Sequence, residues 1–144
     1  MRIVVQRVKS ASVEVDGNVV GSIDKGLMLL VGFTEGDSSE VINYLVNKLI
    51  KLRIFDDENG IMNKSIIDVG FNILSISQFT LYADTSGGNR PSYAKALKSD
   101  EAITLYKLFN EELNKYVDVE EGIFGREMAV SLVNDGPVTI ILER

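Results

Sequence analysis

The longest apolar run of the chain is Gly26-Leu27-Met28-Leu29-Leu30-Val31-Gly32-Phe33. Its length and its flanking glycines are typical of a strand that is buried on both faces, and it is short for a helix. A membrane-spanning helix needs about 20 apolar residues, so this run is too short for that role as well. We therefore predict a buried strand here, around which the rest of the chain packs.

Alternating sequences precede the buried strand. Polar and apolar residues alternate over residues 3–8 and again over 11–15, and Asp16-Gly17-Asn18 provides a hairpin turn before residues 19–23. The first segment has neither the basic stretch nor the small-residue cleavage site of a signal peptide, so we read it as the N-terminal strand of a mature protein.

Two later segments have helical spacing. In each, a capping residue precedes apolar residues three or four positions apart: Asp37 or Ser38 before Val41, Leu45, Leu49 and Leu52, and Ser99-Asp100-Glu101 before Ala102, Leu105, Tyr106, Phe109 and Leu113. The remaining segments read as extended pieces, namely residues 61–63, 65–69, 71–82, 120–124, 127–133 and 138–142.

The sum is about eight strands and two helices, and no repeat or linker divides them. Domains cluster at about 100–150 residues, which matches the chain length. We predict a single domain over residues 1–144, of mixed α/β class, with a mostly antiparallel, barrel-like sheet and two packed helices.

The composition excludes several kinds of chemistry. The chain has no His, no Cys and no Trp, and its 15 Lys and Arg against 21 Asp and Glu give a net charge of −6. Ser-His-Asp and Cys-His nucleophiles are therefore absent, as are disulfides and zinc sites built on imidazole or thiolate. We expect a cytosolic protein with no cofactor and no bound metal. The acidic balance argues against indiscriminate binding of nucleic acid but permits contact with RNA through a small local patch.

One polar segment lies within otherwise apolar sequence, Ser77-Gln78-Phe79-Thr80-Leu81-Tyr82. Strand alternation would place Gln78 and Thr80 together on one face, which is either a solvated face or the floor of a polar pocket. The following loop, Gly87-Gly88-Asn89-Arg90-Pro91, favours the pocket, since a loop with little side-chain bulk lets a ligand approach the main chain.

A second candidate is Asn134-Asp135-Gly136-Pro137. By itself it favours an ordinary turn between strands. The alternative is a cis Gly136–Pro137 bond, which would direct two carbonyls the same way and provide acceptors for an ammonium group.

The charged residues suggest solvated faces for the most part. The acidic clusters at 56–58, 111–112 and 120–121 lack the spacing of metal ligands. The best candidates for contact with phosphate are the local basic groups: Lys48, Lys51 and Arg53, and Arg90, Lys95 and Lys98. Of these, we expect five to contact a phosphate-bearing ligand: Lys48, Lys51, Arg90, Lys95 and Lys98.

The two candidate segments, together with Gln6-Arg7-Val8 and Ala11-Ser12-Val13 near the start, resemble the signature segments of the bacterial and eukaryotic D-aminoacyl-tRNA deacylase family. The resemblance covers essentially the whole chain. It implies an editing hydrolase that cleaves the ester between a D-amino acid, or glycine, and the terminal adenosine of tRNA. It also implies a homodimer whose sites lie at the subunit interface, with no membrane association.

Carried onto this chain, the resemblance implies that Ser77, Gln78, Phe79 and Thr80 line the catalytic pocket. Gly136 and Pro137 would enter the partner's pocket, hold the substrate ammonium and exclude L side chains, while Arg7 would fix their loop. The 2′-hydroxyl of the terminal ribose would assist hydrolysis, with main-chain amides near Phe79 and Thr80 stabilising the oxyanion. Thr80 as a nucleophile ranks second, since no His is present to activate it.

Two other functions remain open: a non-catalytic dimer that binds tRNA or nucleotides, and a deacylase of relaxed chirality that proofreads small L-amino acids, which a trans Gly136–Pro137 bond would indicate. One residue departs from the family pattern: members usually carry a small residue where this chain has Arg126. We expect that change to affect packing or the interface nearby. Tyr93 replaces a common Phe conservatively.

Overall fold

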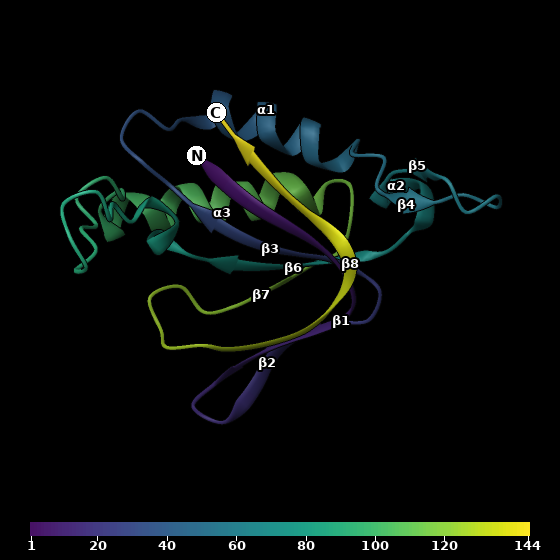
Figure 1. Ribbon diagram of the computed structural model, residues 1–144, viewed down its shortest axis with the longest axis horizontal. Helices are drawn as coiled ribbons and strands as arrows, with labels where there is room; N and C mark the ends of the chain where they lie inside the picture. The colour runs from purple at the N-terminus through teal and green to yellow at the C-terminus, as the bar shows by residue number, and fades with distance from the viewer.

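The computed structural model describes residues 1–144 as a curved six-stranded sheet with helices packed on one face (Figure 1). The elements in chain order are β1 (Arg2–Val15), β2 (Asn18–Ile23), β3 (Gly26–Gly32), α1 (Ser39–Ile50), β4 (Phe55–Asp56), β5 (Met62–Lys64), α2 (Ile66–Val69), β6 (Asn72–Ser77), the 3-10 turn η1 (Phe79–Tyr82), α3 (Ser99–Asn114), β7 (Val119–Glu121) and β8 (Ala129–Glu143). None of the helices has both the length and the apolar character needed to cross a membrane.

Strand β1 organises the sheet because it pairs with three other strands, all antiparallel. Its first half pairs with β3, its second half with β2, and its other edge with β8 along most of its length. The two predicted strands at 3–8 and 11–15 are thus one strand, with Lys9 and Ser10 exposed between its halves. Strand β2 returns close to β7, which curls the sheet toward a barrel.

The mixed α/β class and the barrel-like sheet are confirmed, with one refinement. Strands β3 and β6 are parallel, and so are β6 and β7, so the sheet is mixed. The parallel pairs need long crossovers, and α1 and α3 provide them. The carboxyl ends of β3 and β6 therefore meet at one edge of the sheet.

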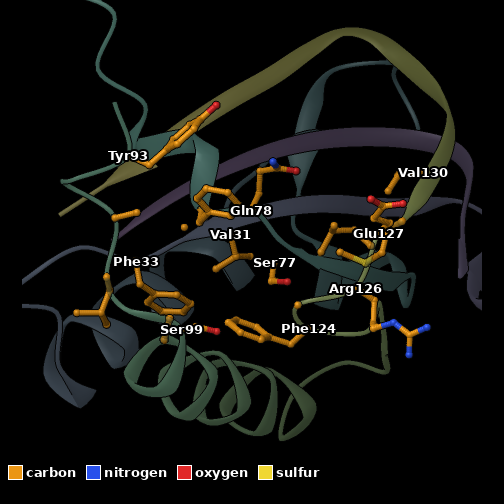
Figure 2. Close-up of a pocket in the computed structure, with 18 residues that line it drawn as sticks. Val31, Phe33, Ser77, Gln78, Tyr93, Ser99, Phe124, Arg126, Glu127 and Val130 are labelled. Atoms are coloured by element: carbon orange, nitrogen blue, oxygen red, sulfur yellow. The ribbon is translucent and has the colours of Figure 1, made fainter. Parts of the chain in front are cut away.

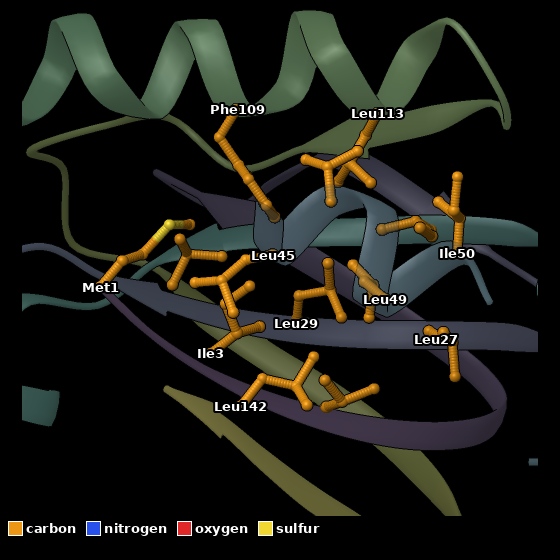
Figure 3. Close-up of a cluster of buried hydrophobic side chains, with 14 of the residues drawn as sticks. Met1, Ile3, Leu27, Leu29, Leu45, Leu49, Ile50, Phe109, Leu113 and Leu142 are labelled. Atoms are coloured by element: carbon orange, nitrogen blue, oxygen red, sulfur yellow. The ribbon is translucent and has the colours of Figure 1, made fainter. Parts of the chain in front are cut away.

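Strand β3 is buried on both faces, as its uninterrupted apolar run predicts. Leu27 and Leu29 face the larger core, where α1 and α3 cover the sheet (Figure 3). Met28 faces a smaller core inside the curl of the sheet, together with Val13 of β1 and Leu74 of β6. Packing in the larger core fixes the positions of both helices relative to β3.

Helix α2 covers Ile66–Val69 with Ser65 as its N-cap, so the prediction of an extended piece over 65–69 is wrong. The Ser65 hydroxyl accepts a hydrogen bond from the Asp68 N–H, and the Asp68 carboxylate accepts one from the Ser65 N–H at 2.8 Å, which is a capping box. Gly70 then ends the helix with a φ of 65°. The adjacent Ile66 and Ile67 are β-branched, which favoured a strand in the sequence.

The predicted turn at 134–137 is also wrong, because β8 runs through it. Between the pairs Gln6–Thr139 and Val8–Asn134, β1 advances two residues while β8 advances five. The extra residues, Asp135-Gly136-Pro137, form a bulge on a continuous strand. A bulge of this kind contains turn-forming residues but does not reverse the chain. The sequence pattern alone does not distinguish such a bulge from a turn.

Candidate functional site

A pocket of about 660 Å³ lies where the carboxyl ends of β3 and β6 meet. Such ends are the usual ligand site of sheets with parallel strands, because the loops that leave them diverge. Figure 2 shows Val31 and Phe33 from the end of β3 beside Ser77 and Gln78 from the end of β6. The pocket is closed by Tyr93, Ala96 and Leu97, by Ser99 and Ala102 of α3, and by residues 124–128 and Val130.

Three of the four predicted catalytic residues line this pocket: Ser77, Gln78 and Phe79. Thr80 lies just behind them, and its hydroxyl accepts a hydrogen bond from the Gln78 side-chain amide. The pocket interpretation of this segment is therefore favoured over a solvated strand face.

The segment does not have the strand geometry predicted for 71–82. The ladder between β3 and β6 ends with the Gln78 N–H donating to the Val31 carbonyl at 2.7 Å, and the chain then turns. The first bond of the turn runs from the Leu81 N–H to the Gln78 carbonyl. The N–H groups of Phe79 and Thr80 precede that bond, so they have no partner within the turn and remain available as donors.

Arg2 fixes the turn from outside. Its guanidinium donates to the Leu81 carbonyl at 2.5 Å and lies over the Tyr82 ring, 4.9 Å from the centroid. Burial, together with Asp37 and Glu143, raises the pKa of Tyr82 to about 12, so this hydroxyl stays neutral. The η1 segment is thus held by a permanent cation and a neutral ring.

Gly32 is a positioning residue that the sequence reasoning missed. A Cβ atom built on it would lie 2.9 Å from the Gln78 carbonyl oxygen and 3.2 Å from the Leu81 Cβ. Only a residue without a side chain lets η1 approach the end of β3 this closely. A glycine inside an apolar strand is the signal that would have revealed it.

An aromatic pair forms one rim of the pocket. The rings of Phe79 and Tyr93 pack edge to face with centroids 5.1 Å apart, and both are about half exposed. The loop that carries Tyr93 is tied down by the ion pair between Lys95 and Asp84, 2.8 Å long. This lysine, aided by Ser86, holds the pKa of the Asp84 carboxyl well below its ordinary value.

Gly136, Pro137 and Arg7 do not line the pocket of their own chain. The Gly136–Pro137 peptide bond is cis, and both residues are exposed. Arg7 is buried, pairs with Asp135 at 2.9 Å and donates to the Ile54 carbonyl at 2.7 Å. The Asn134 amide spans the base of the bulge, donating to the carbonyls of Arg7 and Val138. The bulge is therefore anchored on the same strand, β1, that holds η1.

The predicted phosphate-contacting residues fall into two groups. Lys48 and Lys51 lie at the end of α1 that leads to β4 and β5, on the opposite side of the molecule from the loop over residues 83–98 (Figure 1). Arg90, Lys95 and Lys98 lie within that loop, close in sequence to the pocket-lining residues 93, 96, 97 and 99. The structure does not bring the five together, and Lys95 is already paired.

No His, Cys or Lys side chain lines the pocket. Its charged lining residues are Arg126 and Glu127, both in the loop that follows β7, and no group of three or more potential ligands forms a metal site. The fold and the pocket define a mixed α/β protein whose ligand site offers main-chain donors, an amide and hydroxyls. Such groups orient and polarise a carbonyl group.

Comparison with known proteins agrees with the family resemblance noted in the sequence. The family model for D-Tyr-tRNA(Tyr) deacylase matches residues 4–143. A solved structure described as "c-Myc DNA Unwinding Element Binding Protein" is 39% identical, with a TM-score of 0.95 over 100% of this chain and 99% of that one. Another, described as a probable eukaryotic D-amino acid tRNA deacylase, shares the fold at 18% identity, with a TM-score of 0.84 over 98% of this chain and 97% of that one.

The protein is thus a hydrolase that acts on the ester of aminoacyl-tRNA. The chain belongs to the D-Tyr-tRNA(Tyr) deacylase family.

The close approach at Gly32 generates a prediction. In Gly32→Ala the added methyl group pushes the Gln78 carbonyl outward and shifts the N–H groups of Phe79 and Thr80, so we expect kcat for deacylation to fall about tenfold to a hundredfold. Gly87→Ala is the matched control, since a Cβ there meets nothing within 4 Å. Equal activity of the two variants, at equal melting temperature, would contradict this positioning role.

Proposed function

We propose that the protein is a homodimeric editing enzyme that hydrolyses D-aminoacyl-tRNA, and glycyl-tRNA as well, in the cytosol. Each active site combines Ser77, Gln78, Phe79 and Thr80 of one subunit with the Gly136-Pro137 dipeptide of the other. The observation that carries the proposal is the separation of the two signature segments: one lines a pocket, while the other is an anchored, exposed bulge outside that pocket.

Features of β8 support the dimer. This strand pairs only with β1, so its outer edge is free along 15 residues. The exposed side chains on it include Val133 and Ile141, more than half exposed, next to the bulge. A long apolar edge favours association with another copy of the chain. A second copy at this edge would cover these side chains and bring its own bulge with it.

Chiral selection follows from what the dipeptide lacks. Gly136 has no side chain and Pro137 no N–H, so the dipeptide offers carbonyl oxygens to a ligand, and these accept from an ammonium group. With the ammonium held there and the ester carbonyl directed at η1, the side chain of an L-amino acid points at the dipeptide, and that of a D-amino acid points away. Rejection rather than recognition then sets specificity, so side chains of many sizes are accepted.

In this site, hydrolysis is promoted by orienting the water and the ester and by polarising the ester carbonyl group. The free N–H groups of Phe79 and Thr80 are donors for the developing oxyanion, and one such donor typically contributes about 3–4 kcal/mol. The 2′-hydroxyl of the terminal ribose, next to the ester, orients or activates the water. The Thr80 hydroxyl accepts from an amide N–H, which is a donor and cannot remove a proton, so its environment does not favour a threonine nucleophile.

The activity itself is tested with two substrates. We expect the purified protein to release D-tyrosine from D-tyrosyl-tRNA and to leave L-tyrosyl-tRNA intact, measured as loss of acid-precipitable labelled amino acid. Release of L-alanine from L-alanyl-tRNA would instead support the deacylase of relaxed chirality that proofreads small L-amino acids. Binding of tRNA without hydrolysis of either ester would support the non-catalytic alternative.

Subunit mixing tests the shared site. We take one variant damaged in the pocket, Gly32→Ala with Gln78→Ala, and a second damaged in the bulge, Gly136→Val. Each alone should be at least tenfold less active than wild type. Random reassociation after mixing places one intact pocket opposite one intact bulge in each heterodimer, so activity should recover to about a quarter of wild type. If the dipeptide served its own chain, mixing would restore nothing.

Assistance by the substrate 2′-hydroxyl and a threonine nucleophile predict different losses of kcat when Thr80 or the 2′-hydroxyl is removed. We expect Thr80→Ala to reduce kcat about tenfold or less, and a tRNA ending in 2′-deoxyadenosine to lose most of its turnover with the unchanged protein. Thr85→Ala, in the exposed loop, is the control. A loss of about a thousandfold or more in Thr80→Ala, with the deoxy substrate still turned over normally, would establish the nucleophile instead.

A further inference from the structure

We propose that Arg126 binds a phosphate of the tRNA acceptor strand where that strand leaves the pocket. This inference rests on the proposed function, because it takes the tRNA 3′ end as the ligand. It goes beyond that function by assigning the contact between an acidic protein and an acidic polymer to one residue.

The charge of the pocket points to this residue. Among the 18 lining residues Arg126 is the only cation, and the chain as a whole carries a net charge of −6. The reacting ester is attached to the terminal ribose and has no phosphate of its own. The first phosphate lies on the 5′ side of that nucleoside, so it meets the rim of the pocket and not the floor.

Arg126 lies at that rim. Figure 2 shows its guanidinium at the edge of the pocket, directed away from Ser77 and Phe124. The main chain beneath it is fixed, because the Arg126 N–H closes a turn onto the Ile123 carbonyl at 3.2 Å and Gly125 takes a φ of 76°. A fixed turn holds the main chain of Arg126 in place at the rim, within reach of a ligand that leaves the pocket there.

The present partner of Arg126 is replaceable. Its guanidinium pairs with Asp16 at the tip of the β1–β2 hairpin, and the two side chains are 53% and 72% exposed. Exposed ion pairs of this kind contribute little to stability. A phosphate accepts two parallel N–H bonds from a guanidinium, so it can replace the carboxylate at low cost.

The test compares two substrates that differ in phosphate. One is D-tyrosyl-tRNA, and the other is the D-tyrosyl ester of adenosine, which contains no phosphate. For Arg126→Ala we expect KM for the tRNA to rise about tenfold at low salt with kcat unchanged, and both constants for the adenosine ester to stay the same. The salt dependence of KM should also become shallower, by about one unit of log–log slope.

Asp16→Asn is the matched control. It removes the ion pair but keeps the cation, so KM for the tRNA should stay the same or fall. A rise equal to that of Arg126→Ala would show that the ion pair itself matters, through the hairpin, and would overturn the phosphate contact. Equal losses on both substrates in Arg126→Ala, or no loss on either, would overturn it as well.

A binding measurement separates this inference from the proposed function. An RNA hairpin with a single-stranded 3′ adenosine that carries no amino acid has the phosphates but no ester, so its binding is measured without any reaction. If neither ester is hydrolysed but Arg126→Ala weakens binding of this hairpin about tenfold, the proposed function fails and the phosphate contact stands. If the esters are hydrolysed with the predicted chirality and Arg126→Ala binds the hairpin as wild type does, the contact is wrong and the function stands.

Discussion

The hydrogen bond from the Gln78 N–H to the Val31 carbonyl is the constraint on which the site depends. It is the final rung between two parallel strands, and at 2.7 Å it fixes where β6 stops and η1 begins. One residue further along β3, Gly32 leaves the space into which the turn folds. The main-chain donors of Phe79 and Thr80 are therefore positioned by the buried centre of the sheet and not by a mobile loop.

Strand β1 connects this turn with the second signature segment. Arg2, near its start, holds the Leu81 carbonyl, and Arg7, five residues later, holds Asp135 beside the Gly136-Pro137 bulge. Arg7 is buried and its partners lie on the loop before β4 as well as on β8, so the bulge is braced from two sides. The proposed exclusion of one enantiomer by collision requires a rigid dipeptide, and these contacts restrain the bulge that carries it.

Much of the fold follows from sequence periodicity, and the exceptions have physical causes. The run at Leu27–Val31 and the helical spacing around Leu45 and Phe109 predict the core correctly, since burial leaves a direct pattern of apolar residues. The strand end at Ser77 was missed because apolar residues continue into η1, and the turn is set by contacts from Arg2 and Gly32, which are distant in sequence. The bulge at Asp135 was missed because strand pairing with β1 overrides turn-forming residues.

The residues of the candidate site were also only partly predictable from the sequence. Ser77, Gln78 and Phe79 follow from the resemblance and lie in the pocket, whereas the five basic candidates are scattered over two sides of the molecule. Helix ends and loops accumulate exposed cations for reasons of solvation alone, so their number carries little information about a ligand. Arg126 is different because a glycine turn fixes it at the rim of a pocket with no other cation.

The proposed geometry of the site explains why a chain without histidine can act as a hydrolase. A general base is useful where the protein must generate the nucleophile, but an ester of a ribose already has a neighbouring hydroxyl that can orient water. In the proposed mechanism, the protein holds the ester against main-chain donors and excludes the wrong enantiomer, and backbone groups do both. Backbone N–H and carbonyl groups do not titrate between pH 5 and 8, and Tyr82 behind them stays neutral with a pKa of about 12. The groups proposed to act on the ester therefore keep one charge state across this range, so the pH dependence of the reaction should reflect hydroxide and the substrate ammonium.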